Sequence, residues 1–251
     1  MSASEIRLNA RKILKGKWGK AVLMTLAYAL FTFIVNFILN FIPVVGSIIS
    51  LIISVPIYYG FVASFIDLKR NQETNAFTFT SEGFGQFSKA WAVYLRIILK
   101  CLIPIILLII SIGLTVYATA YSTVSLYTAT VSNTVPTTIR IISLILIIIS
   151  CIWLICRNLS YSLSNYILKD NPDMTSKEII EESARLMNGN RLKLIWLGIT
   201  FIGWYILSSL TLGIGLLWVL PYTQISTIEF YEQLSGKSNN VVEIEEVDPI
   251  N

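Results

Sequence analysis

The sequence of 251 residues contains no histidine, only three cysteines and few charges, since Asp, Glu, Lys and Arg make up 14% of it. Without histidine the chain lacks the commonest general base and the commonest metal ligand. Cys101, Cys151 and Cys156 lie in apolar runs without a Cys-x-x-Cys spacing, which predicts neither a disulfide framework nor a metal site. Phosphate-binding glycine loops and hydrolase motifs are also missing from the sequence. We therefore expect no catalytic residue, no cofactor and no metal, and a protein that is not an enzyme.

Apolar residues make up 55% of the chain, the mean hydropathy is +0.69, and three long stretches, 21–66, 101–139 and 194–228, carry no charge. A helix that crosses the hydrocarbon layer of a membrane needs about 20 apolar residues. Turn residues near the middle of the first and third stretches divide each into two segments. We therefore predict an all-α polytopic membrane protein with six transmembrane helices: TM1 at 20–42, TM2 at 45–67, TM3 at 91–117, TM4 from 141 onward, and TM5 and TM6 as a hairpin within 194–228.

Lysine and arginine gather before TM1, between TM2 and TM3, and between TM4 and TM5, whereas Arg140 stands almost alone on the other side. The positive-inside rule then places both termini in the cytoplasm. The Ser/Thr/Tyr-rich stretch 118–138 is predicted to be an outer loop. We divide the chain into a basic amphipathic interfacial helix at 1–19, a six-helix membrane domain at 20–236 and an acidic disordered tail at 237–251.

Two amphipathic helices are predicted on the cytoplasmic side. The first begins with the capping-box spacing of Ser2 and Glu5 and should lie in the interface, its cations facing the anionic inner leaflet. Its candidate lipid contacts are Lys12, Lys15 and Trp18. The alternative is that these cations serve only to orient TM1. The second helix, at 175–189, has an acidic side that anionic lipid would repel. We expect it to dock on the protein itself or on a membrane protein partner.

The two ends of the membrane domain resemble each other. Residues 10–17 before TM1 are similar to residues 184–190 before TM5, and TM2 and TM6 each contain a proline close to tyrosine. This pattern predicts two parallel-repeat hairpins, TM1–TM2 and TM5–TM6, around a central TM3–TM4 pair. Chance similarity among Leu/Ile-rich segments is the alternative. Because proline kinks a helix, we expect a cavity between the kinks. Its candidate residues are Pro56, Tyr59, Pro221 and Tyr222.

The inner end of TM4 is polar, and Arg157, Asn158 and Asn165 are candidate contacts for a lipid phosphate or an anionic ligand. The alternative is an arginine that extends to the membrane surface above a solvated end of the helix. Glu229 and Glu232, three residues apart on TM6, have the reach to pair with such basic groups.

Several segments match the pattern of one known family: ESARLMNGN at 182–190, FIGW at 201–204, TLGIGLLW at 211–218, and IPVVG at 42–46. On these motifs the chain resembles an uncharacterised integral membrane family of Gram-positive bacteria, the domain of unknown function 975 type. It is more distantly similar to the membrane domain attached to some glycerophosphodiester phosphodiesterases. The resemblance implies a bacterial cell membrane and contact with lipid or polyglycerolphosphate. The family usually has a short connection where this chain has the stretch 118–138.

These observations predict a non-catalytic membrane protein of the cell envelope that interacts with lipid or another amphiphile, or that serves as an accessory subunit of a membrane complex. The alternatives are an exporter of a small solute or peptide, an immunity protein against membrane-active peptides, and a membrane-embedded lipid enzyme. The net charge of +4 combines a basic N-terminal helix with an acidic tail. It favours the anionic inner leaflet over nucleic acid as a partner.

Overall fold

The computed structural model describes residues 2–42, 44–128 and 134–237, and within these ranges all regular secondary structure is α-helical. Of the predicted acidic tail 237–251, all but Lys237 lies outside the described residues. The helices in chain order are α1 (Ala3–Leu14), α2 (Trp18–Leu39), α3 (Val45–Lys69), α4 (Thr78–Gly85), α5 (Phe87–Thr128), α6 (Thr134–Tyr161), α7 (Ser164–Asp170), α8 (Ser176–Met187), α9 (Arg191–Ile199), α10 (Ile202–Leu210) and α11 (Leu216–Leu234).

Five segments of the described chain are long and apolar enough to cross a membrane: Trp18–Leu39, Val45–Lys69, Phe87–Val124, Pro136–Asp170 and Arg191–Leu210. The chain is thus an all-α protein with the helices of a multi-pass membrane protein. The predicted sixth span, TM6, corresponds to α11, which has 19 residues but is not apolar enough to be counted among these segments. Its second half contains hydroxyl and amide side chains together with Glu229 and Glu232.

The predicted hairpin of TM1 and TM2 is confirmed, with α2 and α3 ending within a few residues of the expected positions. The turn between them depends on close approach of the backbone. Val44 adopts a positive φ of 66°, and a Cβ at Gly46 would overlap the carbonyl oxygen of Leu39. Glycine at this position therefore allows α3 to start directly against the end of α2.

The predicted outer loop at 118–138 is wrong over most of its length, because α5 continues to Thr128 and α6 begins at Thr134. The polar residues of this stretch are compatible with a helix since their hydroxyls bond backbone carbonyls one turn back, as Thr119 does to Thr115 (2.8 Å). Arg140 of α6 donates to the Ser122 hydroxyl of α5 at 2.8 Å and joins the two helices. With 42 residues, α5 is about 63 Å long, about twice the thickness of the hydrocarbon layer.

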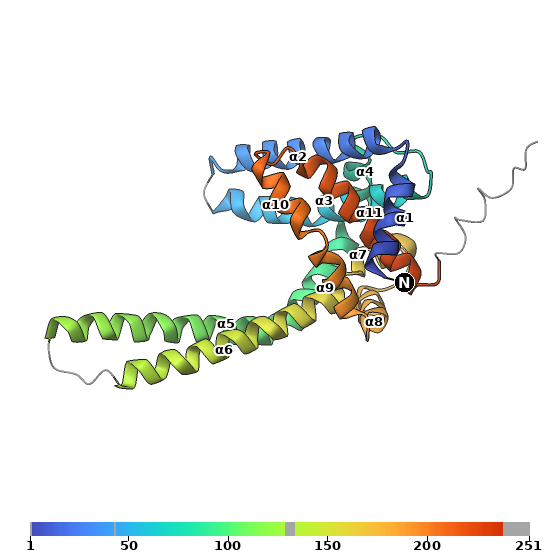
Figure 1. Ribbon diagram of the computed structural model, residues 1–251. Coiled ribbons are helices and arrows are strands. Elements are labelled where there is room, and N and C mark those ends of the chain that lie inside the picture. Colours follow the sequence, from blue (N-terminus) through green and yellow to red (C-terminus); the bar gives the residue numbers. More distant parts are fainter. Residues whose placement is uncertain (1, 43, 129–133, 238–251) are drawn as a thin grey trace, which may run out of the picture.

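The predicted TM5 consists of two short helices, α9 and α10, separated at Thr200 and Phe201. The turn predicted near the middle of the stretch 194–228 is confirmed. Leu212 and Gly213 take positive φ values of 52° and 88° before α11 begins at Leu216. The helix α11 packs against α2, α3 and α10, and Figure 1 shows the hairpin of α5 and α6 extending away from these helices.

Both predicted amphipathic helices form, and both begin with a capping box: the expected one of Ser2 with Glu5 in α1, and one of Thr175 with Glu178 in α8. The apolar face of α1 is buried on α11, and that of α8 is buried on α5, α6 and α7. Each helix therefore covers the protein with its apolar side. This is one of the two outcomes expected for α8.

The packed interior lies at one end of the molecule, which we call the charged end. It is formed by α1, α4, α7 and α8 together with the C-terminal halves of α3 and α11, and Phe201 packs against Tyr222 of α11. Tyr231, Phe65, Phe79 and Phe201 are among its largest fully buried side chains. The opposite ends of α2, α3, α5 and α6 expose mainly Leu, Ile, Val and Phe, the composition of a surface that faces lipid.

Candidate functional site

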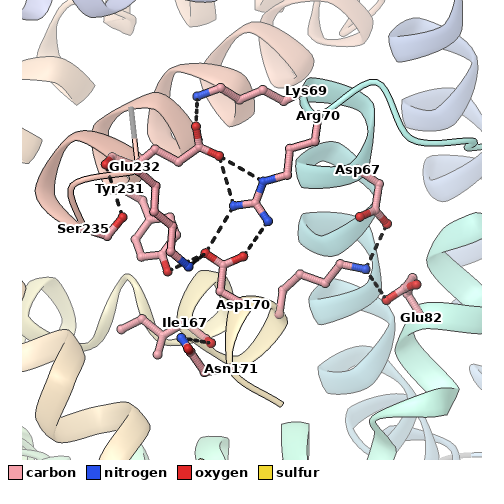
Figure 2. A network of polar contacts seen from close by, with 12 residues as sticks. Asp67, Lys69, Arg70, Glu82, Ile167, Asp170, Asn171, Tyr231, Glu232 and Ser235 are labelled. Atoms are coloured by element: carbon pink, nitrogen blue, oxygen red, sulfur yellow. Dashed lines mark hydrogen bonds and ion pairs between the residues drawn. The ribbon is translucent and has the colours of Figure 1, made fainter. Parts of the chain in front are cut away.

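A network of ion pairs, most of them buried or half-buried, joins four helices at the charged end (Figure 2). Its charged members come from the end of α3, from α4, from α7 and from the last turns of α11 and the residues just after it. They are Asp67, Lys69, Arg70, Glu82, Lys169, Asp170, Glu229, Glu232 and Lys237. Segments far apart in sequence are thereby held together by charge.

Lys69 lies at the centre of this network, and its side chain is only 2% exposed. Its ammonium nitrogen is 2.5 Å from the Glu229 carboxylate and 2.6 Å from that of Glu232. The adjacent Arg70 binds Asp170 at 2.6 Å and Glu232 at 3.1 Å. The spacing of Glu229 and Glu232 puts both carboxylates on the face of α11 that meets the end of α3.

A second part of the network links α7 to α3 and α4. Lys169 contacts Asp67 at 3.0 Å and Glu82 at 2.9 Å. Asp170 accepts hydrogen bonds from the Tyr231 hydroxyl (2.9 Å) and the Lys237 ammonium group (2.7 Å) in addition to Arg70.

The contacts of Arg70 fix its charge. Burial alone would lower the pKa of Arg70, but the hydrogen bonds and negative charges of Asp170 and Glu232 together outweigh it and raise this pKa above its ordinary value. Arg70 therefore stays protonated. The ammonium and guanidinium groups of the network form ion pairs with the carboxylates, and these ion pairs connect the helices.

The structure brings the predicted residues Lys12, Lys15 and Trp18 together around one recess of about 380 Å³, where α1 ends and α2 begins. Arg11, Gly16 and the half-exposed Leu8 complete its lining. Gly16 has a φ of +82°, which lets the chain turn sharply so that Trp18 returns toward the cations of α1.

The predicted residues Arg157, Asn158 and Asn165 are not brought to one point. Arg157 donates a hydrogen bond to the Tyr161 hydroxyl at 3.0 Å. Asn165 lines a second recess, of about 320 Å³, together with Tyr161. Asn158 is exposed on α6 and is not among the residues that line this recess.

Pro56, Tyr59, Pro221 and Tyr222 are all buried within the packed interior. The Tyr222 hydroxyl donates to the carbonyl oxygen of Arg7 at 3.2 Å, which ties α11 to α1. The second recess is lined by Ser54, Val55 and Tyr58 of α3, on both sides of Pro56 in the sequence, but not by Pro56 itself. That these four residues border a cavity stays a prediction.

The sequence had pointed to basic groups near the inner end of TM4 as partners of Glu229 and Glu232. The structure instead pairs both with Lys69, and Glu232 also with Arg70, on α3. The position of these two cations at the end of TM2, where the proposed repeat matches the end of TM6, is the signal that could have identified them. In the described part of the chain, no group of three or more Asp, Glu, Cys or His residues could hold a metal ion.

The model of a family described as "Protein of unknown function (DUF975)" covers residues 1–238. No curated protein and no solved structure matches the chain.

Proposed function

The chain belongs to the DUF975 family, and from its own residues we propose that it is a non-catalytic, multi-pass protein of the bacterial cell membrane that binds anionic lipid at its charged end. Both termini would lie in the cytoplasm, where the positive-inside rule puts the basic segments. The charged end would then meet the inner leaflet, whose negative surface potential attracts lysine and arginine.

The observation that carries this proposal is the recess at the junction of α1 and α2. Arg11, Lys12 and Lys15 are all exposed there, and Leu8 is 49% exposed beside them. Trp18, which is partly buried, supplies an indole ring at the same place. Three cations next to an apolar chain and an indole ring suit a phosphate headgroup and the upper part of its acyl chains.

We also propose that α11 completes a six-helix bundle of two similar halves. Ser2, Glu5 and Gly16 of the first half have counterparts 173 residues later in Thr175, Glu178 and Gly189, and both glycines have a positive φ. Two further parallels join α3 and α11. Each contains an internal proline, and each is followed by a residue of positive φ, Asn71 or Gly236.

A protein partner is a further part of this proposal. Because the apolar face of α8 is packed within the chain, such a partner would contact the exposed charged side of α8, where Lys177 and Glu181 lie. An accessory role in a membrane complex is therefore compatible with lipid binding at α1.

Lipid binding can be tested by native mass spectrometry of the purified protein in nanodiscs that contain equal amounts of phosphatidylglycerol and phosphatidylcholine. We expect the wild type to retain phosphatidylglycerol preferentially. Each basic residue near an anionic surface contributes about 1 kcal/mol, so replacing both Lys12 and Lys15 with Gln should weaken this retention by about 30-fold.

The matched control is K177Q/R185Q, which removes the same two charges from exposed positions on α8. We expect it to retain phosphatidylglycerol as the wild type does. Equal retention by K12Q/K15Q and the wild type would refute the proposed site. Equal losses in both double variants would mean that net charge, and not the recess, determines binding.

A further inference from the structure

The second recess lies between two hairpins and is lined by tyrosines from four helices. It is bordered by Tyr28 of α2, Ser54 and Tyr58 of α3, Tyr94 of α5, Tyr161 of α6 and Asn165 of α7. We call it the tyrosine recess. Its volume of about 320 Å³ is at the lower end of the range for small-molecule sites.

The tyrosine recess lies at a depth where acyl chains begin. Tyr28 comes ten residues after the first residue of α2, about 15 Å along the helix axis from the charged end. Tyr58 lies eleven residues before the last residue of α3, at a similar distance. With the charged end at a membrane surface, both tyrosines lie below the headgroups. Polar groups at this depth are costly unless they find a partner.

Several polar groups in the recess have no such partner in the protein. Within the described ranges, the hydroxyls of Tyr28, Tyr58 and Tyr94 and the amide of Asn165 make no hydrogen bond. The Tyr161 oxygen accepts from Arg157, which leaves the Tyr161 proton available to donate. The recess thus presents hydroxyl and amide donors between apolar walls.

These donors specify the chemistry of the occupant. A group of hydroxyl donors next to a guanidinium favours a ligand rich in acceptor oxygens. Among the residues that line the recess there is no carboxylate, and Arg157 is held against Tyr161. A quaternary ammonium ligand would therefore meet a positive charge without a compensating negative one, in spite of the aromatic rings.

We infer that the tyrosine recess binds one glycerolipid molecule, whose ester carbonyl oxygens accept hydrogen bonds from the tyrosine hydroxyls. Its acyl chain lies along the apolar side chains of Val55, Val93 and Ile97, which complete the wall. This inference rests on the proposed lipid-binding function and adds to it a second site. The second site selects the ester linkage of a lipid, whereas the recess at α1 selects a negative headgroup.

The test uses phosphatidylcholine with a photoactivatable diazirine in one acyl chain, in nanodiscs that contain the full-length protein. This probe has no net charge, so the cations at α1 do not determine where it reacts. We expect crosslinks in the peptides that contain residues 54–58 and 90–97. S54L, which fills the recess, should reduce this labelling by at least about tenfold.

S209L is the matched control for this substitution. Ser209 of α10 is exposed, and its hydroxyl bonds the carbonyl of Ile206 three residues back, as the Ser54 hydroxyl bonds that of Leu51. We expect S209L to be labelled like the wild type. Labelling that is spread evenly over the apolar helices, or that S54L leaves unchanged, would overturn the inference.

Hydrogen bonding is tested with the ether-linked analogue of the same probe, which lacks the ester carbonyls. We expect the wild type to be labelled more weakly by the ether than by the ester, by about fivefold for each hydrogen bond lost. In Y58F/Y94F the two probes should label equally, whereas Y117F/Y121F, which changes two tyrosines of α5 outside the recess, should retain the difference. No preference for the ester in the wild type would refute the assigned ligand class.

The experiments can refute the two lipid-site assignments independently of each other. If K12Q/K15Q keeps its labelling in the tyrosine recess but loses phosphatidylglycerol, both assignments hold. If phosphatidylglycerol is retained as proposed but the recess is not labelled, the inference fails while the proposed function stands.

Discussion

Removing the ammonium group of Lys69 should destabilise the whole charged end. In K69M the side chain keeps its length and apolar stem, but Glu229 loses its only ion-pair partner in the described chain. The neutral amides of Asn9 and Gln233 remain near Glu229, at 3.4 Å and 3.1 Å. Glu232 retains Arg70 at 3.1 Å. The main cost is therefore one buried carboxylate without a counter-charge.

Breaking a buried ion pair by removing one partner costs about 3–5 kcal/mol, because the remaining charge is left in a poorly solvated site. We expect K69M to lower the unfolding free energy in detergent by this amount. E229Q should cost less, since Lys69 still contacts Glu232 at 2.6 Å. The double variant K69M/E229Q removes both charges of the pair. The loss of unfolding free energy in the double variant should therefore be smaller than the sum of the two single losses, by at least about 1 kcal/mol.

The assay is unfolding of the purified protein, followed by circular dichroism, for the wild type, the two single variants and the double variant. K177M is the control, because Lys177 and Glu181 are 3.9 Å apart and both largely exposed. It should change stability by less than about 0.5 kcal/mol. If K69M is as stable as K177M, or if the two single losses simply add, then Lys69 does not compensate Glu229 as the geometry indicates.

Two further predictions concern local contacts. A Cβ at Gly60 would overlap the carbonyl oxygen of Phe79 where α4 crosses α3, so G60A should destabilise the protein by about 1–3 kcal/mol in the same assay. G113A, on α5 with open space around it, should have no such cost and instead gain up to about 1 kcal/mol from helix propensity; equal effects would contradict the close approach. In the capping box of α8, hydrogen bonds from the backbone N–H and hydroxyl of Thr175 lower the pKa of Glu178 below its ordinary value. The box thus stabilises α8 above the unfolded-state pKa, and this contribution is lost as the pH falls through the lower folded-state pKa. Hydrogen exchange of the first turn of α8 should show the loss in the wild type but not in E178Q, and identical pH profiles would exclude the box as its cause.

Structural features that depend on residues close together in the sequence were predictable. The α2–α3 hairpin follows from a charge-free run that ends at Asp67 and from the turn at Gly46. The two capping boxes follow from a hydroxyl residue three positions before a glutamate, as Thr175 stands before Glu178. Both kinds of feature are local, so a single sequence contains the information for them.

The length of α5 and the ion network were not predictable in the same way. A Ser/Thr/Tyr-rich composition indicates a loop, but in α5 a hydroxyl such as that of Thr119 bonds the preceding turn. Helix and loop are therefore both compatible with this composition. The pair of Lys69 and Glu229 joins positions 160 residues apart. Their spacing along the chain does not indicate which cation meets which carboxylate, because helix packing decides it.

The ion network and the tyrosine recess share one short helix, and this connects stability to the proposed lipid site. From α7, Asn165 faces the recess, while Lys169 and Asp170 are held by carboxylates and cations of α3, α4 and the end of α11. Buried ion pairs add little net stability over apolar packing, but their directional contacts fix how helices sit against one another. The network thus sets the position of the recess wall. Because α7 is held from the charged end, a lipid bound in the tyrosine recess would meet the Asn165 amide in a position that is already set, and this contact would require little ordering of α7.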